Sequence, residues 1–207
     1  MKLRNRARLR AAETVLSDND QRLVWRLAAL LLDYPTAETC LLIDQMATAT
    51  GQLAEPVCSD ITDFLLYFCR TEPTDRVARY LETFDVRHRS RLHLTYYAHG
   101  TRKRDLALLR LRQSYRQAGF AIGDTGAPDY LPLVLEFAAT ADPVNGQRLL
   151  AEHASALELL RVSLHASDSP YAGLLAAVLV TLPSSAAAER RRMAELSTAG
   201  ATARGVA

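Results

Sequence analysis

Prolines at the starts of predicted helices constrain the fold of this chain more than any other feature of its sequence. Pro56 and Pro73-Thr74 each precede a segment whose apolar residues recur at helical spacing. Proline suits the first helical turn because the N–H that it lacks would have no partner there. Asp142-Pro143 and Ser169-Pro170 add two starts in which a capping residue stands before the proline. Strand signals are scarce, since Asn145-Gly146 lies in a helical context rather than between alternating apolar residues.

The segment 18–33 predicts the first helix, with Asp18 or Asn19 as its N-cap. Its apolar residues form one stripe along the helix. A second stripe is charged and consists of Arg22, Arg26 and Asp33.

The remaining pattern is also helical. Residues 37–50 predict a second helix, and residues 171–182 predict a buried one. The chain therefore predicts an all-α fold, a single-domain helical bundle of about nine or ten helices over residues 18–196. Residues 1–17, which are basic, and residues 197–207 are predicted to be disordered tails.

Composition limits the class of protein. Hydrophobic residues make up 49% of the 207 residues, enough for a core. The formal net charge is only +2, which argues against a protein that is basic throughout for nucleic acid. No secretory signal follows the basic start, and no stretch reaches the ~20 apolar residues of a membrane span. We therefore expect a cytoplasmic protein.

The three cysteines, Cys40, Cys58 and Cys69, are expected to be reduced and mostly buried. Cys58 and Cys69 lie eleven residues apart on one predicted helix, a separation of ~16 Å. A disulfide needs Cα atoms within ~7 Å, so this pair cannot form one.

Residues 102–119 predict a helix with two different faces. One face is apolar and can dock on a core: Ala107, Leu108, Leu111, Tyr115 and Ala118. The other face combines arginines with Leu106 and Leu109. Two interpretations stay open. Other helices supply carboxylates and cover both leucines, or the face binds a partner.

No catalytic motif is found. The five histidines contain no i,i+4 pair, and the sequence has no GxxxxGK[ST], GxGxxG or GxSxG. His99, which precedes Gly100, is interpreted as a residue at a helix C-terminus. We expect no enzyme, no bound metal and no cofactor.

A second short motif, APDYLPLVLEFAA, covers residues 127–139. Asp129 can cap a helix, and Pro132 is tolerated in a first turn. Glu136 lies among apolar residues, where an acid is rare unless it is paired. We expect it to meet an arginine of residues 102–116 or a cationic group on a partner.

Four segments, taken in order, resemble the nitrate reductase molybdenum-cofactor assembly chaperones. They are VWRLAALLLDYP, RYLETFD, LTYYAHGTRKRDLALLRLRQSYRQAGF and APDYLPLVLEFAA. This NarJ (delta subunit) family belongs to the TorD-like redox-enzyme maturation proteins, and the resemblance covers residues 22–182. It implies an all-helical fold without catalysis. It also implies binding, in the cytosol, to the N-terminal segment of the apo catalytic (alpha) subunit of respiratory nitrate reductase, and help with insertion of the molybdenum cofactor.

The chain departs from the family pattern at two places. Members commonly have Pro-Asp-His where this chain has Pro128-Asp129-Tyr130. They also commonly carry an Asp between the residues that correspond to Gly100 and Thr101. The first departure puts a proton-sensitive role of that position in doubt, and the second removes one acid from a turn.

The resemblance suggests eight peptide-binding residues: Phe84, Asp85, Tyr96, Tyr97, Asp129, Leu133, Glu136 and Phe137. Core packing is the alternative role, and for Phe84, Leu133 and Phe137 it is the stronger one. Three arginines are possible contacts to an acidic client surface or to cofactor phosphates: Arg102, Arg112 and Arg116.

Two other functions compete with this interpretation. A TetR-like DNA-binding regulator would need a basic recognition helix near the start, whereas residues 37–50 contain acids and no Lys or Arg. A helical adaptor for a different client stays possible. We expect a monomer or weak dimer.

Overall fold

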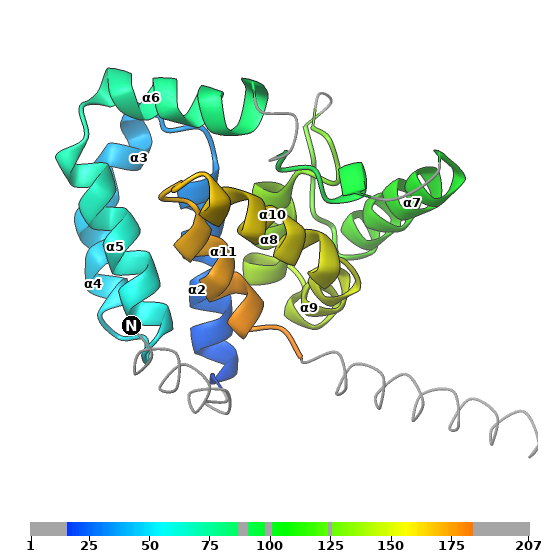
Figure 1. Ribbon diagram of the computed structural model, residues 1–207. Coiled ribbons are helices and arrows are strands. Elements are labelled where there is room, and N and C mark those ends of the chain that lie inside the picture. Colours follow the sequence, from blue (N-terminus) through cyan, green and yellow to red (C-terminus); the bar gives the residue numbers. More distant parts are fainter. Residues whose placement is uncertain (1–15, 87–90, 98–100, 124–125, 184–207) are drawn as a thin grey trace, which may run out of the picture.

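The computed structural model describes residues 16–86, 91–97, 101–123 and 126–183 (Figure 1). Within these ranges the chain forms ten α-helices and no β-strand, which confirms the predicted all-α fold. The helices are α2 (Asp18–Leu32), α3 (Ala37–Leu41), α4 (Ile43–Thr50), α5 (Val57–Arg70), α6 (Pro73–Leu81), α7 (Thr101–Gln117), α8 (Leu131–Thr140), α9 (Pro143–Glu152), α10 (Ala154–Ala166) and α11 (Ala172–Val180). A π-helical turn, η1 (Glu82–Val86), continues α6, and a 3-10 turn, η2 (Leu94–Tyr97), precedes α7.

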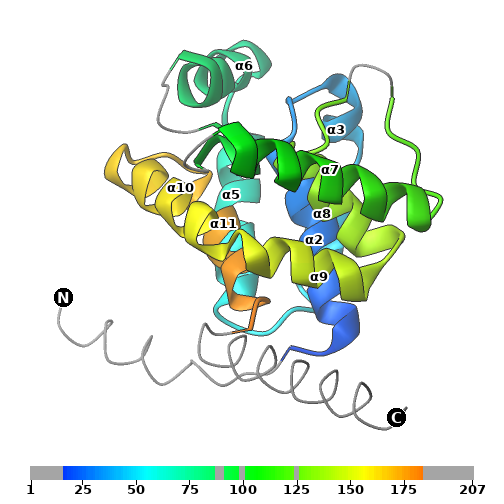
Figure 2. The same ribbon diagram turned by 90° about the vertical axis from the view of Figure 1, so that its right-hand side faces the viewer.

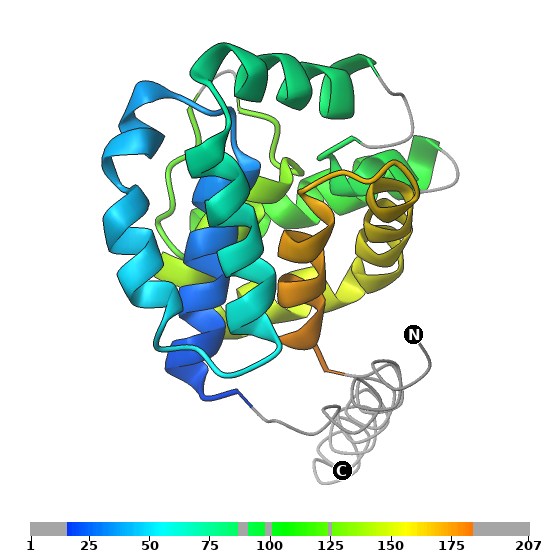
Figure 3. The ribbon, with the colours of Figure 1, turned by 60° about the vertical axis from the view of Figure 1, so that its left-hand side comes forward.

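Helix α2 lies at the centre of the bundle, between α3 to α6 on one side and α7 on the other (Figure 1). It packs along α8 and against α11. The indole N–H of Trp25 donates to the Thr181 hydroxyl at 2.7 Å, which ties α2 to the end of α11. Figure 3 shows α2, α5 and α11 standing side by side. Seven residues of α2 are buried: Val24, Trp25, Leu27, Ala28, Ala29, Leu31 and Leu32.

Proline places several helix starts as predicted. Pro73 and Pro143 are the first residues of α6 and α9, and Pro132 lies in the first turn of α8. The Asp142 side chain accepts a hydrogen bond from the N–H of Asn145 at 3.0 Å, as expected of an N-cap.

Two of the predicted proline starts differ from the structure. Pro56 is the N-cap of α5 rather than its first residue, and α11 begins at Ala172 after the N-cap Tyr171, so Ser169-Pro170 does not start it.

Other boundaries also differ from the prediction. The N-cap of α2 is Ser17, whose hydroxyl accepts from the N–H of Asp20, rather than Asp18 or Asn19. The helix predicted over residues 37–50 is divided at Leu42 into α3 and α4. A capping box formed by Thr36 and Thr39 gives α3 a start of its own.

The cysteines are free, but their predicted burial is wrong. Cys40 and Cys69 are exposed and Cys58 is half-buried. Cys58 and Cys69 share α5, as expected. No helix in the described ranges combines the length and the apolar character that a membrane span requires.

Helices α8 and α9 pack closely at Gly146. A Cβ added to this glycine would overlap the Cα and Cβ atoms of Ala138, which lies on the facing side of α8. Backbone and Cβ atoms cannot rotate away, so the absence of a side chain at Gly146 sets the separation of the two helices.

We predict that Gly146→Ala lowers the free energy of unfolding by about 1–2 kcal/mol, because overpacking outweighs the gain in helix propensity. Urea unfolding followed by circular dichroism measures the change. Gly51→Ala is the matched control, since a Cβ there meets nothing closer than 3.5 Å. A Gly146→Ala variant as stable as the Gly51→Ala variant would contradict the close approach.

Candidate functional site

A pocket of about 310 Å³ lies where the end of α6 and η1 face the chain before α8. Seven residues line it: Tyr80, Phe84, Asp85, Arg91, Leu92, His93 and Tyr130. They come from three separate stretches of sequence, so the fold rather than local order assembles the pocket.

Two backbone hydrogen bonds fasten the stretch before η2 to the start of α8. The N–H of Leu131 donates to the carbonyl of Leu92 at 2.7 Å, and the N–H of Leu94 donates to the carbonyl of Asp129 at 3.0 Å. His93 and Tyr130 thus face each other as an isolated antiparallel bridge. This pairing holds one wall of the pocket.

Asp129 lies behind that wall with only 2% of its surface exposed. One carboxylate oxygen accepts from the hydroxyl of Thr95 and from its N–H, and the other lies 3.1 Å from Nδ1 of His93. Burial opposes the charge of this carboxylate, but the hydrogen bonds from His93 and Thr95 outweigh it and lower the pKa of Asp129 to about 2. Asp129 therefore orients His93 and does not cap α8, whose N-cap is Tyr130.

Tyr130 joins three elements through its hydroxyl group. The hydroxyl donates to Oδ1 of Asp33 at 2.8 Å and lies 3.0 Å from the hydroxyl of Tyr80. Burial raises the pKa of Tyr130 well above its ordinary value, and burial raises that of Tyr80 to about 12. Both hydroxyl groups therefore stay protonated at physiological pH. A histidine, which the similar family commonly has at the position of Tyr130, can change its charge in that range.

Tyr80 and Phe84, which give the pocket its apolar side, belong to a cluster of tilted and edge-on aromatic rings. Phe84 is 5% exposed, and its ring centroid lies 5.0 Å from that of Tyr80 and 4.9 Å from that of Tyr171. Tyr34 adds an edge-on contact to Tyr80 at 5.5 Å. Such ring pairs stabilise beyond the area that they bury, by ~0.5–1.5 kcal/mol each.

Half of the predicted peptide-binding residues meet around this pocket. Phe84 and Asp85 line it, and Asp129 holds His93 in it. Tyr96 is 43% exposed, and the guanidinium of Arg91, which also lines the pocket, lies 5.3 Å from its ring centroid. The side chain of Tyr97 lies outside the described part of the structure.

The other predicted residues lie further along α8. Leu133 is half-buried, and Phe137 is completely buried against Tyr115 and Phe120, with ring centroids 4.8 and 5.5 Å away. A peptide docked on this conformation cannot reach Phe137.

Glu136 forms an ion pair with Arg26 of α2. The expected pairing with an arginine of residues 102–116 is therefore wrong. Arg22 also reaches across to α8, where its Nε donates to the carbonyl of Ala139 at 3.0 Å.

The two faces predicted for residues 102–119 are present in α7. Leu111 and Tyr115 are buried, whereas Leu106 and Leu109 are 50% and 59% exposed. The described helices therefore do not cover the two leucines, and that interpretation is wrong. The three arginines predicted as possible client or anion contacts are exposed: Arg102, Arg112 and Arg116.

Sequence reasoning missed much of the pocket: Tyr80, Arg91, Leu92 and His93, with Asp33 and Thr95 in support. The sequence held one indication for Asp33, which lies on the charged stripe of the helix predicted over residues 18–33 together with Arg22 and Arg26. All three side chains bond to α8 or to its N-cap. The other residues carried no local signal.

Comparison with known proteins identifies the family. The chain matches the family described as nitrate reductase delta subunit over residues 50–177, a range that contains the pocket and α7. The chain belongs to this family. The predicted resemblance is thereby confirmed.

Individual relatives agree with this assignment. The chain is 30% identical over 172 residues to the probable nitrate reductase molybdenum cofactor assembly chaperone NarJ of Bacillus subtilis, covering 81% of this chain and 92% of that protein. It is 31% identical over 148 residues to the assembly chaperone NarJ of Escherichia coli K12, covering 70% and 63%. It is also 38% identical over 162 residues to the nitrate reductase-like protein NarX of Mycobacterium tuberculosis H37Rv, covering 76% of this chain. The chain spans about a quarter (24%) of the length of NarX.

We predict that Asp129→Asn lowers the free energy of unfolding at pH 7 by about 2 kcal/mol, since lowering a pKa from 3.8 to about 2 is worth about that much. Because the folded pKa lies below the unfolded one, this stability is complete above about pH 4 and is lost as the pH falls toward 2. The variant should therefore show a flatter decline of stability between pH 4 and 2 in urea unfolding. Asp85→Asn, at an exposed position, is the control. An unchanged slope in the Asp129→Asn variant would contradict the assigned pKa.

Proposed function

We propose that this protein is a system-specific chaperone for a nitrate reductase. It binds the N-terminal segment of the apo catalytic subunit in the cytoplasm and assists insertion of the molybdenum cofactor, with no catalysis of its own. The observation that carries the proposal is the similarity to NarJ of B. subtilis, which extends over 92% of a protein named as an assembly chaperone.

The pocket offers the kind of anchoring site that such a segment needs. Its volume of about 310 Å³ lies at the lower end of the ~300–1,000 Å³ of ligand pockets, so it suits a few side chains rather than a whole helix. Tyr80 and Phe84 provide apolar rings, and exposed Asp85 places a negative charge at the rim. A client segment with an apolar residue beside a basic one would match both features.

The pocket is held in shape by its own hydrogen bonds. His93 is fixed by Asp129, and Tyr130 is fixed by Asp33 and Tyr80. A preformed site loses less conformational entropy when a peptide binds, which favours affinity.

The predicted contacts therefore divide into three groups. We retain Phe84, Asp85 and Tyr96 as direct contacts, and we place Tyr97, Leu133 and Glu136 at the margin of the docked segment. Asp129 and Phe137 are not contacts, because both are buried and neither lines the pocket; Asp129 supports the site through His93.

Calorimetry with a peptide that copies the first ~30 residues of the co-encoded catalytic subunit tests the function. We expect saturable binding, and we expect Asp85→Asn to weaken it about threefold to tenfold, as is typical for loss of one charge at the rim of a site. The difference between wild type and variant should shrink in 0.5 M salt, because salt screens exposed charges (Debye length ~10 Å at 0.1 M).

Asp44→Asn serves as the matched control, since Asp44 is an exposed acid on α4 that does not line the pocket. If Asp85→Asn and Asp44→Asn weakened peptide binding equally, the peptide would not bind at this pocket. No binding across pH and salt would contradict the chaperone function. Equally tight binding of an N-terminal peptide from an unrelated redox enzyme would favour a general helical adaptor.

A further inference from the structure

Helix α7 has a higher net positive charge than the whole chain. It contains six basic residues and one acidic residue, a net charge of +5, whereas the chain has a net charge of +2. The rest of the chain therefore sums to −3. Among the helices that the structure describes, the net positive charge is therefore concentrated on α7.

The basic residues of α7 form no ion pair within the described part of the structure. The ion pairs found among the described residues involve α2, α6, α8, α9, α10 and the stretch around His93, and none involves a basic residue of α7. Arg112 and Arg116 stand at i,i+4, where like charges destabilise an isolated helix by ~0.2–0.5 kcal/mol. An opposite charge supplied from outside would remove that cost.

The two exposed leucines of α7 lie between its basic residues along the helix. Leu106 and Leu109 are 50% and 59% exposed, the largest exposures of any leucine on α7. They belong to a stripe with helical spacing i, i+4, i+7, i+11 and i+14. The stripe consists of Arg102, Leu106, Leu109, Gln113 and Arg116.

The opposite side of α7 packs against the rest of the molecule, which holds the exposed stripe in place. Leu111 is completely buried, and the Tyr115 hydroxyl donates to the carbonyl of Pro128 at 2.7 Å. Figure 2 shows α7 lying across one face of the molecule with α9 beneath it. A hollow of about 240 Å³ between the two helices is lined by Ala107, Arg110, Leu149, Glu152 and His153.

We propose that the outer face of α7 docks an acidic amphipathic helix of a partner protein. The two leucines would pack against apolar residues of that helix, and the arginines at each end would bond to its carboxylates. The planar guanidinium matches a carboxylate with two parallel hydrogen bonds, and arginine is enriched in protein interfaces whereas lysine is depleted. Five of the six basic residues of α7 are arginine. This face uses none of the residues that line the pocket, so the proposal stands apart from the peptide binding proposed above.

Other occupants match the face less well. Single-stranded nucleic acid is bound by aromatic stacking as well as by positive charge, and Tyr115, the aromatic residue of α7, is buried. A second copy of the chain would bring two faces of +5 together, which repel each other. Insertion into a membrane surface depends on apolar area, and two leucines provide little of it.

Fluorescence anisotropy with a labelled 18-residue helical peptide, which has a leucine seam flanked by glutamates, tests the proposal on the full chain. We expect this peptide to bind at least tenfold more tightly than a peptide with the same residues in scrambled order. Leu109→Ser should weaken binding about threefold to tenfold and Arg116→Glu at least tenfold. Both variants should melt within ~2 °C of the wild type, as expected for exposed positions.

Leu41→Ser and Arg70→Glu are the matched controls, because both residues are exposed and lie on α3 and α5, on the other side of the molecule (Figure 1). These controls should bind the peptide as the wild type does. Equal binding of the scrambled peptide, or equal loss in the controls, would overturn the proposal. So would tighter binding of anionic vesicles or single-stranded RNA that is weakened by the same α7 variants.

Discussion

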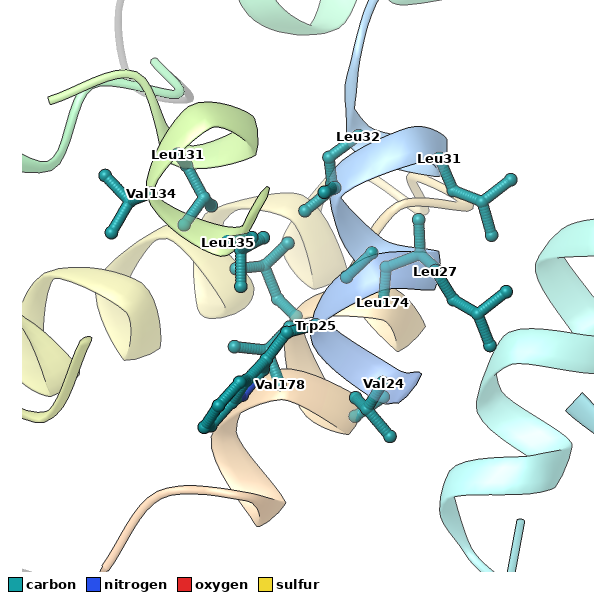
Figure 4. Packing of buried hydrophobic residues seen from close by; sticks show 14 of the residues in the cluster. Val24, Trp25, Leu27, Leu31, Leu32, Leu131, Val134, Leu135, Leu174 and Val178 are labelled. Atoms are coloured by element: carbon teal, nitrogen blue, oxygen red, sulfur yellow. The ribbon is translucent and has the colours of Figure 1, made fainter. Parts of the chain in front are cut away.

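The packing of α2 along α8 is the interaction on which the rest of the structure depends. Three bonds cross this antiparallel contact: Asp33 to Tyr130, Arg26 to Glu136, and Arg22 to the carbonyl of Ala139. Between them, apolar side chains of α2, α8 and α11 meet in one cluster (Figure 4). These contacts fix the position of α8 against α2, and with it the position of Tyr130 at the start of α8, which lines the pocket.

Two polar side chains that shape the pocket, Asp129 and Tyr130, have their hydrogen bonds made by neighbouring side chains. Asp129 is satisfied by Thr95 and His93, and the hydroxyl of Tyr130 is satisfied by Asp33 and Tyr80. A buried acid whose pKa is lowered to about 2 and a tyrosine whose pKa is raised by burial hold their protonation states around neutral pH. This arrangement suits a rigid recognition site, because the hydrogen bonds hold the side chains of His93 and Tyr130 in one position.

The two surfaces for which we propose partners differ in their charged groups. The pocket presents aromatic rings with one acidic and one basic side chain, Asp85 and Arg91, whereas α7 presents leucines among arginines. An apolar segment with a basic residue beside Asp85 suits the first surface, and an acidic segment suits the second. Repulsion between the arginines of α7 and a basic segment disfavours exchange of the two partners.

The sequence by itself determined the helical class, several helix starts and the two faces of α7, because these follow from neighbours within one or two helical turns. Asp142-Pro143 and the spacing of Leu106 and Leu109 are examples. Only the tertiary structure decided the partners of Glu136 and Asp129 and the assembly of Tyr80 and His93 into one pocket. The physical reason is distance along the chain: Asp129 is 36 positions from His93. Which side chains meet over such a separation is set by how whole helices pack, and no local pattern of residues encodes it.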